Sequence, residues 1–377
     1  MRSGIKKTLS LLVLGAVVFG LTTISFTGDK VKITTNFFND NAGLSVQSPT
    51  VELVKFLSRR AVLSLRYSLD RVSLPPVRGI AGIPAPIDGI TGASRPVGAT
   101  GIADAYSKNR NEFIAGLELS SFSIQGYYSQ ESDYIGRLAT VGISEEFNQK
   151  NTNLSLSFSQ GYDDINPTGS ANHYIKKSQA VNLALTQALS PKSSLRIGAD
   201  IQRLDGYQSN PYRTVYVGGD HYFERHPPER LRSAVYMKFN TYLAPSGRGA
   251  ALWLEGRYYW DDWGVESKTF GVKFYQYLSR AVLVRYRYRY YTQTGADFYS
   301  PSYPLQGVPA FYTADYKLQP FDAHLFGVLL ECDLNSLGRK SRIGLLGSST
   351  LDVKYERYFS SNDFSANIFQ LGLTFNY

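Results

Sequence analysis

Hydrophobic and polar residues alternate with a period of two along most of the chain after residue 30. In the segment KSQAVNLALTQAL, Val181, Leu183 and Leu185 fall on one face, whereas Asn182 and Thr186 fall on the other. Successive side chains of an extended strand point to opposite sides of a sheet. Alternating segments of about ten residues are typical of transmembrane β-barrels. The pattern therefore predicts an all-β chain.

We expect a transmembrane antiparallel β-barrel of about 16 strands, within a range of roughly 14 to 18, with both chain ends in the periplasm. Short turns are expected at 57–59, 189–191, 243–246 and 278–280, and long loops at 71–110, 161–175, 205–229 and 294–320. Short periplasmic turns and long outer loops are typical of outer-membrane barrels. The strands are predicted near 31–38, 51–57, 61–70, 111–119, 122–130, 135–146, 151–160, 176–188, 193–204, 230–242, 249–260, 265–277, 281–293, 321–333, 349–358 and 364–377.

Residues 1–28 have the layout of a secretory signal peptide. Three basic residues precede an apolar run from Leu9 to Leu21, and small and polar residues follow it. A membrane-spanning helix needs about 20 apolar residues, so an uncleaved anchor is the less favoured alternative. The sequence thus predicts export, with a mature barrel at residues 29–377.

The final segment, FSANIFQLGLTFNY, alternates regularly and ends on the aromatic Tyr377. It resembles the C-terminal signal by which the barrel assembly machinery recognises its clients. We therefore expect the protein in the bacterial outer membrane, with the membrane lipids and this machinery as partners. A soluble β-sandwich that ended in this way would expose an aggregation-prone edge.

The composition adds 28 Tyr and 21 Phe but a single cysteine, Cys332, which excludes a disulfide within the chain. The formal net charge of +9 is spread along the sequence without a long basic run. Together with the export signal, this distribution argues against a nucleic-acid partner.

The segment VLVRYRYRYYTQT places Arg285, Arg287 and Arg289 on one face and tyrosines on the other. An arginine that faces lipid at mid-depth costs about 2 to 4 kcal/mol, so we predict that the three arginines face the lumen. They form either an internal salt-bridge network, which we favour, or a filter for anions. The expected lumen partners on neighbouring strands are Glu255, Arg257, Glu266 and Lys268.

The 71–110 loop is rich in Gly, Pro and Ala and is too long for a hairpin, which suggests an extracellular functional loop or a plug. It contains DGITGAS, which resembles the attachment sequence of the periplasmic flavin transferase. The resemblance implies that Ser94 accepts FMN covalently, and that Asp88, Thr91, Gly92 and Ala93 are recognised by the transferase. The alternative is an unmodified flexible turn.

Other polar clusters carry weaker signals. Asp261 and Asp262 are expected to cap a turn rather than to bind a cation. The segment GGDHYFERHPPER offers metal-ligand types, but we favour a solvated loop because the spacing matches no established site. Its candidate ligands are Asp220, His221, Glu224 and His226. Because no catalytic motif is recognised, no enzymatic activity is expected.

Residues 131–167 and 258–304, together with DGITGAS, resemble an uncharacterised bacterial family, domain of unknown function 3570. Its members look like outer-membrane barrels, and the resemblance implies extracytosolic redox work beside a flavin transferase. The leading interpretation is an outer-membrane barrel, covalently flavinylated and involved in electron transfer. The alternatives are a passive porin-like transport barrel without a cofactor and a structural or adhesive surface protein.

Overall fold

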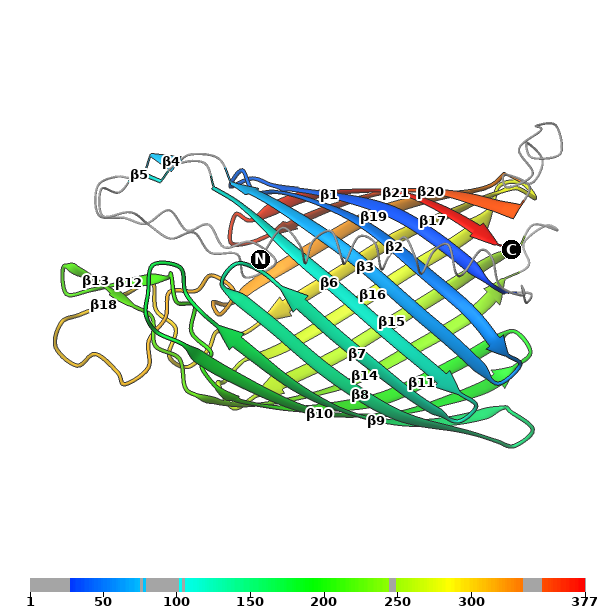
Figure 1. The fold of residues 1–377 in the computed structure, drawn as a ribbon, viewed down its shortest axis with the longest axis horizontal. Helices are drawn as coiled ribbons and strands as arrows, with labels where there is room; N and C mark the ends of the chain where they lie inside the picture. The colour runs from blue at the N-terminus through cyan, green and yellow to red at the C-terminus, as the bar shows by residue number, and fades with distance from the viewer. Residues whose placement is uncertain are drawn as a thin grey trace.

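The computed structural model describes residues 28–74, 77–78, 102–103, 106–243, 249–334 and 348–376. Sixteen strands form one closed antiparallel barrel (Figure 1). The predicted fold is confirmed, and each predicted strand overlaps one strand of the barrel. In order around the barrel, these are β1 (Lys30–Asp40), β2 (Ser45–Ser58), β3 (Ala61–Leu74), β6 (Tyr106–Leu119), β7 (Phe122–Gln130), β8 (Tyr134–Phe147), β9 (Thr152–Ile165), β10 (Tyr174–Ser190), β11 (Ser193–Gly206), β14 (Glu229–Leu243), β15 (Ala250–Asp261), β16 (Glu266–Tyr277), β17 (Val282–Gln293), β19 (Phe321–Asp333), β20 (Ser349–Ser360) and β21 (Ser365–Asn376).

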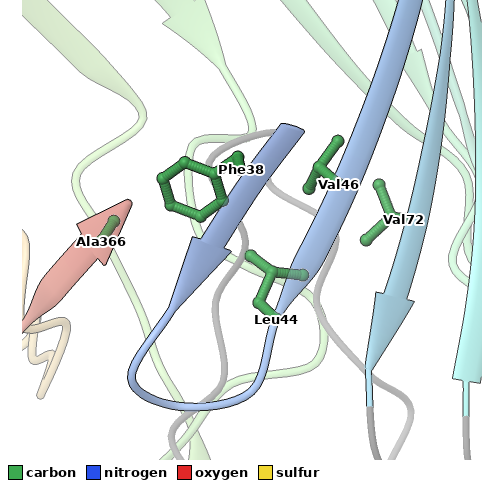
Figure 2. Packing of buried hydrophobic residues seen from close by; sticks show 5 residues of the cluster. All are labelled: Phe38, Leu44, Val46, Val72 and Ala366. Atoms are coloured by element: carbon green, nitrogen blue, oxygen red, sulfur yellow. The ribbon is translucent and has the colours of Figure 1, made fainter. Parts of the chain in front are cut away.

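The first and last strands close the barrel. The register between β1 and β21 runs from Lys30 opposite Asn376 to Asp40 opposite Ala366. Near the outer end of this seam, buried apolar side chains from β21, β1, β2 and β3 and from the adjoining turn gather together (Figure 2). The cluster consists of Phe38, Leu44, Val46, Val72 and Ala366. Its packing supports closure at the junction between strands that are farthest apart in sequence.

The outer surface of the barrel is apolar. Leu183 on β10 is 47% exposed and Ile201 on β11 is 55% exposed, although both lie in the middle of regular strands. Inward neighbours such as Asn182 and Asp200 make polar contacts instead. A soluble protein rarely exposes so large an apolar surface, whereas a barrel in a lipid bilayer requires one. No helix within the described ranges is long and apolar enough to cross a membrane.

The two ends of the barrel differ. The C-terminus lies at the end with most of the short turns, and the longer loops gather at the opposite end (Figure 1). We refer to these as the periplasmic and outer ends. There are exceptions to the predicted division, because the outer connections 41–44 and 361–364 are short and the periplasmic connection 334–348 is long.

The barrel strands extend into the predicted long loops. β3 and β6 reach Leu74 and Tyr106, which shortens the 71–110 loop. This connection also contains the paired strands β4 (Val77–Arg78) and β5 (Ile102–Ala103). Three further short strands form a separate small sheet at the outer end: β12 (Thr214–Val217), β13 (Asp220–Phe223) and β18 (Ser302–Tyr303). The predicted long loops 205–229 and 294–320 therefore contain folded structure.

The two faces of the barrel predict opposite tolerance to charge. We expect Leu183→Arg to lower the free energy of unfolding in lipid by about 2 to 4 kcal/mol, because it places a cation in hydrocarbon. Ser157→Arg is the matched control, since Ser157 pairs with Asn182 beside Leu183 but lines the lumen. Denaturant titration of both variants in lipid vesicles gives the comparison. Equal destabilisation of the two variants would contradict the assigned orientation.

Candidate functional site

The wall of the lumen formed by β11, β14, β15, β16 and β17 is strongly basic, and we call it the basic wall. Strand register places nine cationic side chains and only three carboxylates on its inner face. The carboxylates are Asp200, Glu255 and Asp261. The cations are Arg196, Arg230, Arg232, Lys238, Arg257, Lys273, Arg285, Arg287 and Arg289.

The wall formed by β7 to β10 is mainly neutral at mid-strand. Small hydroxyl and amide side chains line it and bond to one another across the strands, as in the 2.8 Å contact between the Thr140 and Ser159 hydroxyls. The Asn153 amide similarly donates to the Ser144 hydroxyl at 2.8 Å. From β7 to β17 the inner face of the barrel therefore changes from neutral hydrogen-bonding groups to cations.

The three arginines of β17 face the lumen, as their position on the strand predicts. Arg287 Nη1 donates to Glu356 Oε1 at 2.9 Å, and Arg285 Nη2 lies 3.7 Å from the same oxygen. Glu356, on β20, is only 4% exposed. The intervening β19 residue opposite both Arg287 and Glu356 is Gly327, which has no side chain to keep them apart. The favoured salt-bridge interpretation therefore describes Arg285 and Arg287.

Arg289 differs from its two neighbours. Its row across β19 and β20 contains Leu325 and Tyr358, which provide no carboxylate. Its guanidinium lies 5.7 Å from the ring centroid of Tyr291. Among the described residues, no carboxylate lies within ion-pairing distance of it, nor of three other cations of the basic wall: Arg196, Arg232 and Lys238. These four cations are therefore not paired with any described carboxylate.

The partners expected for the β17 arginines need correction. Glu255 faces the lumen, but its Oε1 accepts a 2.7 Å hydrogen bond from Lys273 on β16. Glu266 and Lys268 share the outward face of β16 with Phe270, which is exposed on the outside of the barrel. They were predicted to face the lumen because β16 had been placed without its register relative to β17.

The 207–228 and 294–320 loops fold together over the outer end, and we call them the cap. The small sheet has the order β13-β12-β18, with β12 and β18 parallel, so it draws strands from both loops. Its buried core is Val215, Val217 and Tyr303, with Val308 and Tyr312 packed against it. The cap therefore has its own small hydrophobic core.

A buried carboxylate ties the two loops of the cap together. Glu224 accepts hydrogen bonds from the Asn210 backbone N–H at 2.6 Å and from the Thr313 hydroxyl at 2.8 Å. His226 Nε2 lies 3.4 Å from Glu224 Oε1, and Arg213 lies 3.8 Å from Oε2. The prediction of a solvated loop is wrong for Glu224 and His226, because both side chains are buried.

Burial opposes ionisation of Glu224, but the adjacent His226 and Arg213 side chains and the hydrogen bond from the Asn210 N–H outweigh this effect. They hold the pKa of the Glu224 carboxyl below its ordinary value. An ionised carboxylate is therefore the stable form within the cap.

The cap is anchored to outer turns on both sides of the lumen. On one side, the Tyr212 hydroxyl donates to Asp133 at 2.6 Å and accepts from the Thr168 backbone N–H at 2.7 Å. Burial, reinforced by the hydrogen bond to Asp133, raises the pKa of Tyr212, which keeps its phenol a donor. On the other side, Tyr316 stacks on Phe364 in the turn between β20 and β21. The cap therefore extends over a large part of the mouth.

The turn between β15 and β16 forms a third anchor. Asp261 Oδ1 accepts hydrogen bonds from the backbone N–H groups of Trp263 and Val265, each at 3.0 Å, as expected of a turn-capping residue. Asp261 also pairs with Arg230, whose guanidinium lies 4.0 Å from the Trp263 ring centroid. Trp263 packs edge-on against His226 of the cap. The barrel rim and the cap thus share one packed junction.

Two cavities lie between the cap and the middle of the lumen. The outer cavity, of about 1100 Å³, is bounded by both walls of the barrel and by cap residues such as Asn210 and His226. The inner cavity, of about 620 Å³, lies against the basic wall. Both cavities are lined by the same four residues, which we call the passage residues: Asp200, Arg257, Thr269 and Arg289. The cavities therefore adjoin at this point.

The flavin-attachment prediction lies outside the described residues, as do all five of its positions: Asp88, Thr91, Gly92, Ala93 and Ser94. The predicted signal peptide also lies outside them, apart from Gly28, and so does Tyr377. In the part of the chain that is described, no group of three or more His, Cys, Asp or Glu side chains is arranged to hold a metal ion. Cys332 is a partly buried free thiol on β19.

The partner of the β17 arginines, Glu356, was not predicted, although the sequence contained a signal for its orientation. In the predicted strand 349–358, Glu356 alternates with Tyr355 and Arg357, so its face could be assigned. Its partners lie two strands away along the sheet and about 70 residues away in sequence. The alternation predicts which way Glu356 points, but only strand register shows which cations it meets.

Comparison with known proteins supports the assigned fold. A family model described as "Protein of unknown function (DUF3570)" matches residues 112–180 and 171–362. No curated protein matches the sequence.

Among solved structures, CdiB from Acinetobacter baumannii is 8% identical, with a TM-score of 0.51 over 93% of this chain and 60% of that chain. A bacterial polysaccharide outer membrane secretin is also 8% identical, with a TM-score of 0.48 over 93% and 98% of the two chains. OpdK from Pseudomonas aeruginosa is 8% identical, with a TM-score of 0.45 and the same coverage. At these identities the likeness to CdiB is one of fold alone.

The Glu224 cluster predicts that the cap loosens when this carboxylate is neutralised. Loss of a buried charged hydrogen-bonding group costs about 2 kcal/mol, so Glu224→Gln should raise the open fraction of the cap roughly thirtyfold. Trypsin cleavage after Arg213 and Lys317 at neutral pH measures this fraction. The control is Asp220→Asn, which neutralises an exposed carboxylate at the tip of the same hairpin.

The lowered pKa gives the same cap a pH dependence. Ionised Glu224 stabilises the cap above the ordinary Glu pKa of about 4.3, and this contribution is lost as pH falls through the lowered value. Acidification from neutral pH should therefore change the fluorescence of Trp263 in the native chain much more than in Glu224→Gln. Identical acid titrations, or a cap as resistant to trypsin as the native one, would contradict the role of Glu224.

Proposed function

The chain belongs to the family described as "Protein of unknown function (DUF3570)", and from its lumen we propose that this member is a non-enzymatic outer-membrane channel for small hydrophilic anions. The proposal concerns passage through the barrel in the bacterial outer membrane. The observation that carries it is the basic wall, where cations outnumber carboxylates by nine to three along five consecutive strands.

The cavities support passage of a small solute. The outer cavity of about 1100 Å³ and the inner cavity of about 620 Å³ adjoin at the passage residues. The mainly neutral wall formed by β7 to β10 supplies hydroxyl and amide groups, including those of Ser157 and Asn182, that replace water around a polar solute. The cap excludes bulky molecules because it covers part of the mouth. These features favour small polar solutes.

The charge distribution supports a preference for anions. Two unit charges about 8 Å apart in water interact by about 0.5 kcal/mol, which changes the local anion concentration by roughly twofold. Several unpaired cations act together along the basic wall, whereas Glu356 offsets part of the charge of Arg285, Arg287 and Lys354, which all pair with it. The anion preference is therefore assigned to the unpaired cations, among them Lys238 and Arg289.

Planar-bilayer recording with a KCl gradient tests this proposal. We expect a reversal potential that indicates anion preference, and we expect Lys238→Gln to lower the anion-to-cation permeability ratio by roughly twofold, because it removes one unpaired lumen charge. Lys268→Gln is the matched control, since Lys268 lies on the outward face of β16 in the same barrel. An electrically silent barrel, or equal effects of the two variants, would refute the channel proposal.

A second function is favoured by one sequence observation, the match of DGITGAS to a flavin-attachment sequence. We propose it as an additional property: covalent FMN at Ser94 would give the barrel a redox group for extracytosolic electron transfer. The connection that contains Ser94 joins β3 and β6 at the outer end of the barrel. Transfer by a periplasmic enzyme would then precede insertion of the barrel.

Mass spectrometry of protein purified from its native host tests flavinylation. The peptide that contains Ser94 should be heavier by one FMN moiety, and Ser94→Ala should abolish the increase because it removes the acceptor hydroxyl. Ser107→Ala, at the start of β6, is a control that leaves the motif intact. An unmodified Ser94 peptide in cells with an active flavin transferase would exclude this second function without affecting the channel.

A further inference from the structure

We propose that Arg257, Thr269 and Arg289 form a binding site for the phosphate or carboxylate group of a small solute. The site lies where the outer and inner cavities meet, and we call it the oxyanion site. This site would refine the proposed channel function. It rests on that function in one respect, which is that the solute must enter the lumen. Three observations carry the inference: the spacing of the two arginines, their available charge and their position at the passage.

The three residues come from consecutive strands. Arg257 on β15 lies opposite Thr269 on β16, and Arg289 on β17 lies opposite Gly271, the next inward residue of β16. Neighbouring strands are about 4.8 Å apart, so the backbones that carry the arginines are separated by roughly 10 Å. Only a threonine and a glycine lie between them. The long arginine side chains can therefore approach one ligand from both sides.

Both guanidinium groups are held beside aromatic rings of their own strands. Arg257 lies 5.9 Å from the ring centroid of Tyr259, and Arg289 lies 5.7 Å from that of Tyr291. Contacts with an aromatic face restrict a guanidinium while its N–H groups remain able to donate. The tyrosines thus help to orient the forks towards the lumen.

The charges of the oxyanion site are little compensated within the protein. Arg289 has no carboxylate within ion-pairing distance among the described residues, and Arg257 lies 3.8 Å from Asp200 with its side chain 49% exposed. Arg287, one row away, contrasts with both because it bonds to the buried Glu356 at 2.9 Å. Arg257 and Arg289 can therefore bind an anion from solution without first breaking a strong ion pair within the protein.

The chemistry selects a group with several oxygens. A guanidinium presents a planar fork that matches carboxylate and phosphate oxygens in bidentate geometry. The Thr269 hydroxyl adds a neutral donor between the two forks. All three residues line both cavities, so an anion that moves from one cavity to the other passes them. The oxyanion site is therefore a binding step along the passage.

Calorimetric titration of the full-length protein in detergent tests the site without requiring conduction. With inorganic phosphate as the probe, we expect saturable binding to one site. Arg257→Gln and Arg289→Gln should each weaken it by at least about tenfold, because each removes charged hydrogen bonds. Arg289→Lys keeps the charge but loses the fork and should give a smaller loss. Acetate as a second probe distinguishes carboxylate from phosphate preference.

Arg66→Gln is the matched control. Arg66 is an exposed arginine on the inward face of β3, and it lines neither of the two cavities. This variant should bind phosphate like the native chain, and circular dichroism with heat-dependent gel mobility checks the folding of every variant. Absence of saturable binding to folded native protein by either probe, or equal weakening in Arg66→Gln, would overturn the oxyanion site.

Bilayer recordings of the same proteins separate the two proposals. A silent barrel that binds phosphate through Arg257 and Arg289 would refute the channel and leave the oxyanion site. A conducting, anion-preferring barrel that binds neither probe would refute the oxyanion site and leave the channel.

Discussion

Every backbone N–H and C=O group within a lipid bilayer must find a hydrogen-bond partner in the protein, because hydrocarbon provides none. This chain meets the requirement by pairing each of its sixteen long strands on both sides and joining β1 to β21. Closure fixes the rest of the structure. It turns alternate side chains to lipid and to the lumen, and it places residues distant in sequence in the same transverse row.

This constraint explains why the barrel was predictable. A regular alternation such as that around Leu183 reveals strand direction and orientation without knowledge of the neighbouring strand. The same signal placed Arg285, Arg287 and Arg289 in the lumen. The structure of the connections was harder to predict from sequence. Tyr216 and Tyr303 belong to short strands from two different loops, and these strands pair and share one hydrophobic core.

Pairing between side chains was largely beyond sequence analysis. Alternation places Glu255 and Arg287 on the inner face, but it does not show that Glu255 bonds to Lys273 while Arg287 bonds to Glu356. Glu224 was likewise taken as solvated, because the spacing of the candidate ligands around it matches no established metal site. Its burial depends on Thr313, which lies 89 residues away in the other cap loop. Such contacts require the register and loop folding that only the three-dimensional structure provides.

The same register also assigns different roles to chemically identical side chains. Arg287 and Arg289 are adjacent inward positions on β17, with the same charge and the same reach. The row of Arg287 passes over Gly327 to Glu356, and a side chain at Gly327 would contact that carboxylate.

The row of Arg289 meets Leu325 and Tyr358 on one side and, across Gly271, Glu255 on the other. Glu255 bonds to Lys273 instead and lies beyond ion-pairing distance of Arg289. Glu356 and Arg287 hold one another in place in the barrel wall. On the proposed function, Arg289 is the residue that meets the solute. Structural and selectivity roles therefore fall, on the same proposal, to neighbouring residues of one strand.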